Sequence, residues 1–208
     1  SNYWLPMVQD LRGIIIGGPG ATKDFVVKND YFHHEIKKLI AEPYFDVGYS
    51  NESGLRELIQ RAGSTMDQIE LDIERTLVDE FLKEVMKANP KANYGEVMIR
   101  SALDQGAVST LLLSEALTKM RVCWICKGCK HEWKSTQDRG SSQPNCPECD
   151  SVTVREDSEN SMELIDELTI LAGHTSAQVR LISLDTEEGA TLYSAFGGIA
   201  ALLRYQIS

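Results

Sequence analysis

The sequence predicts an α/β fold of two α/β sandwich-type domains, the C-terminal one carrying an inserted zinc ribbon. Apolar runs of strand length alternate with amphipathic helical segments along the whole chain, which is typical of α/β domains. Two CxxC pairs interrupt the second half of the sequence. We place the domains at residues 1–64 and 65–208, with the insertion at about residues 121–156.

The first domain is predicted to hold two short strands and two helical stretches. Residues 11–17 form an apolar run that ends in glycines, which predicts a buried strand followed by a turn. Residues 24–38 have helical character, and residues 44–48 predict a second strand. Residues 53–62 predict a capped helix, with Glu57 and Arg61 spaced i,i+4 and Gly63 ending it. The turn at residues 18–20 lacks the second glycine of a P-loop, so no nucleotide site is expected.

The second domain alternates helices and strands around the insertion. Thr65 and Gln68 form a capping signal for a long helix, which Asn89 and Pro90 stop. A helix at residues 94–105, ended by Gly106, precedes a strand at 107–113. After the insertion we expect a helix at 160–171, a strand at 178–184, a helix at 186–195 and a strand at 199–207. The six carboxylates of residues 156–167 are interpreted as an acidic, solvated helix start, with a docking patch as the alternative.

Composition and charge limit the classes of function. The chain has 208 residues, 42% of them hydrophobic, and its formal net charge is −10. The charge is −1 over residues 1–64 and −9 over the remainder. Such acidity argues against strong autonomous nucleic-acid binding, which depends on cations that neutralise phosphates. The sequence shows neither a signal peptide nor a membrane-spanning run, so we expect a cytoplasmic chain whose acidic part meets a protein partner.

The strongest local motif is a pair of CxxC turns with sixteen residues between them. These are the spacings of a four-thiolate zinc site, because each turn brings two sulfurs to the edge of a tetrahedron. A closed shell of four sulfurs leaves no position for a substrate water, so the zinc ion is expected to be structural. The predicted ligands are Cys126, Cys129, Cys146 and Cys149.

Cys123 is the alternative ligand, because Cys123 and Cys126 also form a CxxC. We favour Cys126 with Cys129, since Gly128 and Lys130 suit a tight turn and Trp133 stands where ribbons pack an aromatic ring. Disulfides are disfavoured by the odd number of five cysteines and their confinement to one short segment. A ribbon of this size buries little apolar surface by itself, so loss of metal should unfold the insertion alone.

The histidines suggest no catalytic centre. His33 and His34 are neighbours on a helix, where successive side chains point about 100° apart, and no third ligand accompanies them. His131 lies in the ribbon, where four thiolates already complete the shell, and His174 suits a helix end. No nucleophile–base spacing or open metal site is recognisable, so we do not expect an enzyme.

The C-terminal segment Phe196-Gly-Gly-Ile-Ala-Ala-Leu-Leu-Arg-Tyr205 resembles the closing strand of class-1 translation release factors of archaea and eukaryotes, whose pattern is close to FGGIGGILRY. Residues 13–20 and 46–57 are similar to the central domain of the archaeal members. Residues 106–112 match the family's GAV strand. The inserted CxxC pairs point to the archaeal branch.

This resemblance implies a parent protein that enters the ribosome at a stop codon and promotes hydrolysis of peptidyl-tRNA. Its implied partners are the ribosome, a translational GTPase and the ribosome-recycling ABC ATPase. The family's NIKS and GGQ motifs are absent here, and Gly18 is followed by Pro19. We therefore expect a non-catalytic fragment, in which residues 1–64 are a partial central domain and residues 65–208 the GTPase-interacting domain.

The resemblance also implies a set of partner-binding residues in the closing strand, although core packing is an alternative role for the apolar ones. Carried over by position, these are Gly197, Gly198, Ile199, Leu202, Leu203, Arg204 and Tyr205. The ribosome-rescue factor Pelota, which shares these domains but lacks the GGQ loop, is the alternative family member.

Overall fold

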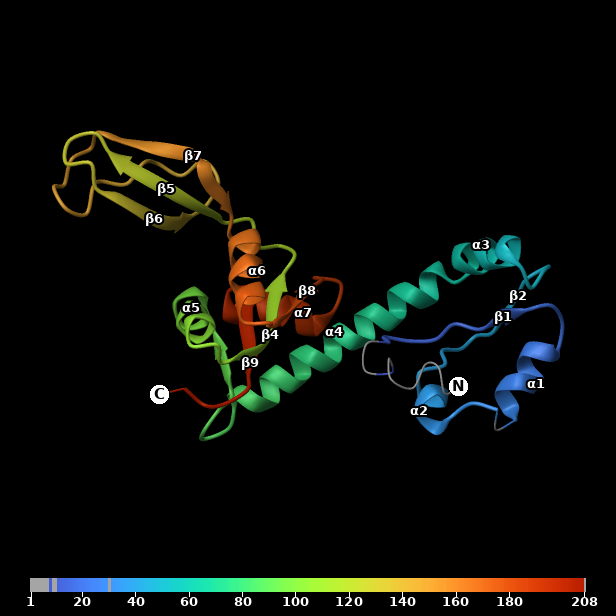
Figure 1. Ribbon diagram of the computed structural model, residues 1–208. Helices are drawn as coiled ribbons and strands as arrows, with labels where there is room; N and C mark the ends of the chain where they lie inside the picture. The colour runs from blue at the N-terminus through green and yellow to red at the C-terminus, as the bar shows by residue number, and fades with distance from the viewer. Residues whose placement is uncertain (1–7, 9–10, 30, 208) are drawn as a thin grey trace. The chain divides into compact units, whose positions relative to one another are not determined.

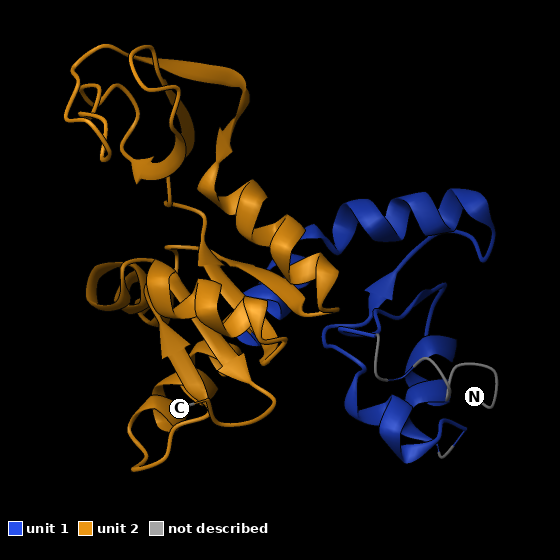
Figure 2. Cartoon of the chain, turned by 60° about the vertical axis from the view of Figure 1, so that its left-hand side comes forward, with its two compact units in different colours: residues 1–73 blue, residues 74–208 orange. Residues whose placement is uncertain are grey.

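The computed structural model describes residues 8, 11–29 and 31–207, which divide into two compact units. Unit 1 spans residues 1–73 and unit 2 spans residues 74–208 (Figures 1 and 2). No helix among the described residues is both long enough and apolar enough to cross a membrane.

Unit 1 is built on a small parallel sheet. Strand β1 (Gly17–Gly18) pairs with β2 (Phe45–Asp46), and helices α1 (Thr22–Lys28), α2 (His34–Lys38) and α3 (Glu52–Arg61) accompany them. The strand expected at residues 11–17 is reduced to β1 and one isolated bridge between Ile14 and Ile40. The single helical stretch expected at residues 24–38 is two helices, because the chain turns to extended backbone at Asn29.

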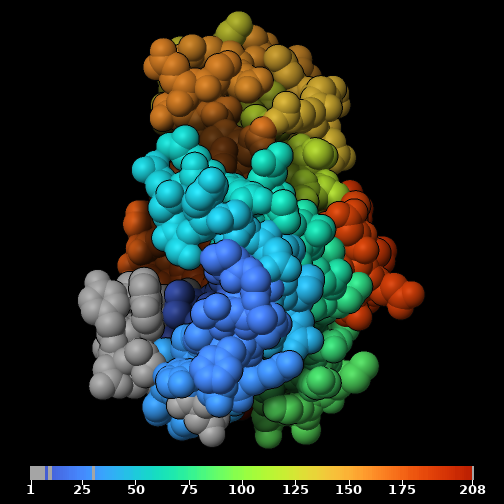
Figure 3. All heavy atoms as spheres, turned by 90° about the vertical axis from the view of Figure 1, so that its right-hand side faces the viewer, coloured from blue at the N-terminus to red at the C-terminus, as the bar shows by residue number. Residues whose placement is uncertain are grey.

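Helix α3 is fastened to β2 by the pair that the sequence places at i,i+4. The Arg61 guanidinium lies 2.6 Å from the Glu57 carboxylate and donates to the backbone oxygen of Asp46 at 2.7 Å. Glu57 also accepts the backbone N–H of Gly48. The helix cap is Asn51, whose side chain accepts from the backbone N–H of the third residue on. α3 lies at the surface of unit 1 (Figure 3).

Gly63, expected to end a helix, instead begins helix α4 (Gly63–Val85). From Glu74 onward α4 belongs to unit 2, where it buries Val78 and Phe81. The helix ends before Asn89 and Pro90, because the Glu84 side chain accepts the backbone N–H of Lys91 and turns the chain back.

The body of unit 2 is a four-stranded sheet in the order β3-β9-β4-β8. Its strands are β3 (Ala92–Tyr94), β4 (Val108–Ser114), β8 (Gln178–Ile182) and β9 (Ile199–Leu203). β9 is antiparallel to both of its neighbours, whereas β4 and β8 are parallel. Helices α5 (Glu96–Asp104) and α6 (Leu164–His174) pack on one face, and α4 and α7 (Glu187–Phe196) on the other (Figure 1).

Strand β9 lies inside this sandwich, and all five of its residues are buried. Because successive side chains of a strand point to opposite faces, Ile199 and Leu203 join the core with α5 and α6, while Ala200 and Leu202 join the core with α4 and α7. The last strand of the chain therefore connects the two hydrophobic cores of unit 2.

The expected strands at 107–113 and 178–184 and the expected helix at 186–195 are confirmed, each with ends within two residues. Two expectations for the body were wrong. Tyr94 belongs to edge strand β3, because Gly95, with φ of 76°, separates it from α5. The last strand, expected to reach residue 207, ends at Leu203. The side chains of Arg204 and Tyr205 bind backbone oxygens at the ends of α6 and α5 instead.

The insertion is a three-stranded antiparallel sheet, which we call the inserted sheet. Its strands are β5 (Met120–Cys126), β6 (Glu132–Gln137) and β7 (Val154–Glu163), in the order β6-β5-β7. The acidic helix start expected from residue 156 was wrong, because β7 continues to Glu163 and α6 begins only at Leu164. Most of those carboxylates line an edge strand, where charge discourages pairing with another chain.

Gly173 in α6 and Gly189 in α7 provide a matched test of how closely the body of unit 2 is packed. A Cβ on Gly189 would lie 1.9 Å from the backbone oxygen of Ser183, whereas a Cβ on Gly173 meets nothing within 4 Å. We expect Gly189→Ala to lower the free energy of unfolding by about 1–3 kcal/mol through overpacking. Gly173→Ala should raise it by up to about 1 kcal/mol, because alanine favours the helix. Urea denaturation measures both values, and equal effects would contradict the close approach at Gly189.

Candidate functional site

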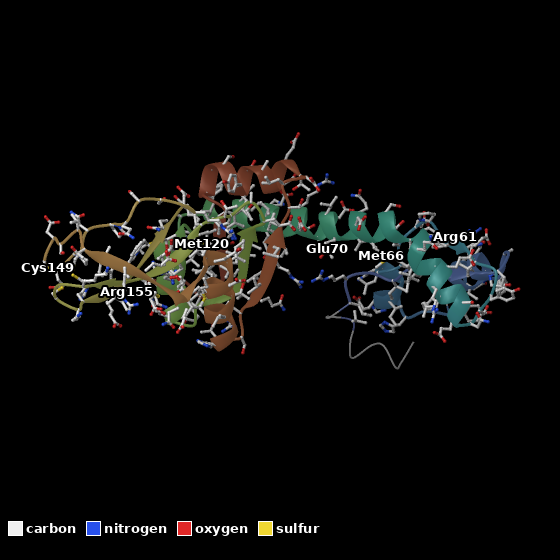
Figure 4. The ribbon with its side chains drawn as sticks, turned by 90° about the horizontal axis from the view of Figure 1, so that it is seen from above. Arg61, Met66, Glu70, Met120, Cys149 and Arg155 are labelled. Carbon is white, nitrogen blue, oxygen red and sulfur yellow. The ribbon has the colours of Figure 1, made fainter. Side chains whose placement is uncertain are left out.

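Four cysteines converge at the end of the inserted sheet away from Met120 (Figure 4). The Sγ atoms of Cys126 and Cys149 are 3.6 Å apart, as are those of Cys129 and Cys146, and all four lie within 4.8 Å of one another. With Zn–S bonds of about 2.3 Å, the edge of a regular tetrahedron of sulfurs is about 3.8 Å. The cluster therefore has the donor atoms and the dimensions of a tetrahedral metal site.

The two CxxC turns have the same backbone pattern. The N–H of Cys126 donates to the oxygen of His131, and the N–H of Cys146 donates to the oxygen of Ser151, five residues on in each turn. In the reverse direction, Lys130 and Asp150 donate to the oxygens of Cys126 and Cys146. Of the two residues expected to suit the tight turn, Lys130 has a positive φ (65°) and Gly128 does not, and Asp150 has the matching φ (55°) in the second turn. This repeated turn presents one buried and one exposed sulfur from each pair.

The electrostatics of the cluster lower the pKa of Cys126 and raise the pKa values of Cys129 and Cys149. Hydrogen bonds from the backbone N–H groups of Cys129 and Gly128 lower the pKa of Cys126 to about 6, against the effect of burial. The His131 backbone N–H acts to lower the pKa of Cys129, but burial and the three neighbouring sulfurs raise it to about 12. Four thiols this close need a cation before all of them ionise.

A small hydrophobic core supports the cluster from within the inserted sheet. Cys126 and Cys146 are buried beside Val122, Trp124 and Val154. The Trp124 indole N–H donates to a serine hydroxyl on β6 at 2.8 Å. The aromatic residue expected in the ribbon, Trp133, packs against this core. The His131 ring stacks on the Trp133 ring, with their centroids 5.8 Å apart.

Cys123 is held away from the cluster. It lies three residues before Cys126 on β5, so its side chain points to the opposite face of the sheet. Its Sγ donates to the backbone oxygen of Asn160 at 3.0 Å, and its N–H donates to the Ser161 hydroxyl. The described structure thus groups the four cysteines of the two separate CxxC pairs, whereas the fifth, Cys123, forms hydrogen bonds with residues of β7.

The candidate partner-binding residues of the C-terminal strand divide by exposure. Ile199, Leu202 and Leu203 are buried at 4%, 8% and 7% exposure. Gly197 and Gly198 form the turn between α7 and β9, with φ of 70° and 74°. A Cβ on Gly198 would lie 3.1 Å from the Tyr193 ring and 3.2 Å from the Cβ of Ser114, which is closer than ordinary contact. These five residues shape the turn and the core.

Arg204 and Tyr205 are exposed, and both bind the ends of helices. The Arg204 guanidinium donates to the backbone oxygens of Thr175 and Ser176 at 3.0 Å, just after α6, and to that of Gly106 at 3.2 Å, just after α5. The Tyr205 hydroxyl donates to the oxygen of Gln105 at 2.6 Å. A cation at two helix C-termini is favourable, since unpaired carbonyls collect there. Sequence reasoning missed this role because the helix ends are distant in the chain.

The other histidines form no ligand cluster among the described residues. His33 is the N-cap of α2 and not, as expected from the sequence, a residue within the helix. Its ring centroid lies 4.3 Å from that of His34 with the ring planes tilted by 39°, and His34 lies 2.9 Å from the Glu35 carboxylate. His174 is the last residue of α6, as its position after Gly173 indicates.

Residues 71–207 match the protein family described as eRF1 domain 3, and residues 2–68 match eRF1 domain 2. The chain is 40% identical to "Peptide chain release factor subunit 1" of Thermococcus sibiricus and 41% identical to that of Thermococcus kodakarensis. Each alignment covers all of this chain and 51% of the relative. The chain therefore spans about half the length of the curated relatives it matches.

Solved structures share the fold. The "C-terminal domain of Peptide Chain Release Factor from Methanosarcina mazei" is 38% identical with a TM-score of 0.64, over 76% of this chain and 98% of that one. An archaeal Pelota in a ribosome-bound state is 21% identical with a TM-score of 0.57, over all of this chain and 50% of that one. At that identity the likeness concerns the fold alone.

The bonds of Arg204 predict a measurable contribution to stability. Arg204→Ala removes charge-assisted hydrogen bonds to the ends of α5 and α6 and should lower the free energy of unfolding by about 1–2 kcal/mol, the exposed position limiting the loss. Arg204→Lys should lose less, because the charge remains. Arg155→Ala is the control, since no ion pair or hydrogen bond of its side chain is found among the described residues, and it should change stability by less than about 0.5 kcal/mol. Equal effects of Arg204→Ala and the control in urea denaturation would contradict the assigned role.

Proposed function

Because this chain belongs to the eRF1 family, we propose that it acts in translation termination, as the partner-binding part of an archaeal class-1 release factor. The observation that carries the proposal is the similarity to archaeal release factors, which extends over the whole chain at about 40% identity. We assign residues 1–64 to the central domain and residues 65–208 to the C-terminal domain. Release of the nascent peptide at a stop codon is then the activity of the whole factor on the ribosome.

The proposed role of these residues is binding and not catalysis. The GGQ tripeptide is absent from the sequence, and the pair Gly17 and Gly18 forms β1 and is followed by Pro19. The body of unit 2 instead offers a sandwich that buries β9, and the two exposed residues after this strand, Arg204 and Tyr205, donate hydrogen bonds to backbone carbonyl groups.

The proposed partners are a translational GTPase and the ribosome-recycling ABC ATPase, bound by the C-terminal domain in the cytoplasm. Arg204 and Tyr205 are the candidates for direct contact, because arginine and tyrosine are frequent anchors of interfaces and their side chains reach solvent. The buried residues Ile199, Leu202 and Leu203, with Gly197 and Gly198, act by positioning them.

The proposed cofactor is one structural zinc ion bound by the four clustered cysteines. The equal 3.6 Å separations, the all-sulfur donor set and the N–H groups directed at Cys126 suit zinc. When bound, the ion would hold the two CxxC turns together. Cys123 remains the alternative ligand by sequence, but the geometry favours its exclusion.

Pelota-like ribosome rescue is the alternative function. The Pelota structures share the fold, but the 21% identity of the archaeal Pelota described above is well below that of the release factors. A GGQ loop in the part of the parent protein upstream of these residues would decide for termination.

Zinc binding is tested with matched cysteine variants. We expect one zinc ion per chain in wild-type protein purified with zinc, measured by atomic absorption. Cys126→Ser and Cys146→Ser should lose most of the metal, because a hydroxyl is a poor zinc ligand. Cys123→Ser is the matched control and should retain the full amount. Loss of zinc from the Cys123 variant, with retention in the Cys126 variant, would reverse the assignment.

GTPase binding is tested by pull-down with the GTP-loaded archaeal translational GTPase. The Arg204→Ala, Tyr205→Ala double variant should bind at least about tenfold more weakly, as expected when two interface anchors are removed. The control is Arg155→Ala with Tyr49→Ala, which removes the same residue types at exposed positions.

Circular dichroism at the assay temperature must show both GTPase-binding variants folded. Weakened binding in the Arg204 and Tyr205 variant alone would support the proposed surface. Wild-type binding with no difference between the variants would place the contact elsewhere on the chain.

A further inference from the structure

The inserted sheet is joined to the body of unit 2 by only two chain segments. One runs from the end of β4 to Met120, and the other is the direct step from β7 into α6 at Leu164. The two segments are tied to each other, because the N–H of Leu164 donates to the oxygen of Lys119 at 2.9 Å. Two covalent crossings side by side make a hinge unless side chains brace it.

One face of this joint is braced by an ion cluster of Glu96, Arg100, Arg121 and Glu167. Arg100 lies 2.8 Å from Glu96 and 2.5 Å from Glu167, which joins α5 to α6. Arg121, on β5, lies 3.6 Å and 3.5 Å from the same two carboxylates. The Thr136 hydroxyl on β6 donates to Glu96 at 2.6 Å. Two strands of the inserted sheet are thus held to two helices of the body.

The four side chains of the ion cluster are only 12–21% exposed, so they attract one another more strongly than surface pairs. Burial alone would lower the pKa of Arg100, but hydrogen bonds to Glu167 and Glu96 outweigh it and raise that pKa. The buried Nε of Arg121 has no hydrogen-bond partner among the described residues. Nη1 of Arg121 donates to the Thr136 hydroxyl of its own sheet at 3.1 Å. Its attachment to the two carboxylates of the body is therefore mainly one of charge.

The opposite face of the joint is open. Alternation along β5 places Arg121 on one side of the inserted sheet and Met120 and Val122 on the other. On that other side lies a cavity of about 200 Å³, lined by Met120 and Val122. A second cavity of about 290 Å³, lined by Lys119 and by Tyr193 of α7, shares Asp138 with the first. The joint therefore has a brace toward α5 and α6 and a groove toward α7.

We propose that this joint is a one-sided hinge, in which the ion cluster holds the inserted sheet toward α5 and α6 and the groove gives it room to swing when the cluster is released. Arg121 is the latch, because it is the residue of the inserted sheet that pairs with both Glu96 and Glu167. Lys134 of β6 also lies 3.5 Å from Glu167, but its side chain is half exposed and pairs with that carboxylate alone. The orientation of the cysteine cluster relative to the body is then set by Glu96 and Glu167 and not by the metal.

Residual dipolar couplings of backbone N–H groups in the zinc-loaded full chain test this hinge. In wild type, one alignment tensor should fit both the inserted sheet, residues 120–163, and the body strands. In Arg121→Met, which keeps the length of the side chain and removes its charge, we expect two tensors. The alignment magnitude of the inserted sheet should fall at least twofold relative to the body.

Arg139→Met is the matched control. Arg139 pairs with Glu163, the last residue of β7, which lies at the same joint. This pair is exposed, and Arg139 lines the groove and is not a member of the ion cluster. It should leave a single tensor. Glu167→Gln is a second variant that should release the ion cluster, and it replaces Arg121→Met if that protein fails to fold. In each variant, unchanged chemical shifts of β4 and β9 show that the body is intact. A single tensor in both release variants, or equal loosening by the control, would overturn the proposal.

Discussion

Insertion of β9 between β3 and β4 is the constraint on which the body of unit 2 depends. This strand arrives last in sequence, yet both of its faces are buried and it belongs to both hydrophobic cores. The residues after it, Arg204 and Tyr205, bind the carbonyl ends of α5 and α6. The sandwich is therefore incomplete until the C-terminus is in place, and two exposed side chains acquire fixed positions as a result.

The inserted sheet has a separate source of order. Its core is small, with two buried cysteines among the five buried residues of its hydrophobic cluster. The proposed metal would therefore act on the same few residues as the packing. It meets the body through the ion cluster and two chain crossings. The body and the insertion are therefore ordered by different contacts and meet at one joint.

Sequence patterns predicted the parts of this structure that are local. The CxxC spacing identified the four cysteines, because a turn of four residues fixes its own geometry, and apolar runs located β4 and β8. Residues 156–163 were misassigned because their carboxylates suit a helix start as well as an exposed edge strand, and only pairing with β5 distinguishes the two. The ion cluster could not be predicted, since its four members come from α5, β5 and α6 and meet only after folding.

The most direct test of this account is hydrogen exchange of the zinc-loaded chain before and after chelation of the metal. If the cysteine cluster and the β9 sandwich are independent sources of order, amides of β5 and β6 should lose about a hundredfold or more of their protection while those of β4 and β9 keep theirs. Loss of protection in β4 and β9 on the same timescale would show that the body also depends on the metal, which would contradict the account.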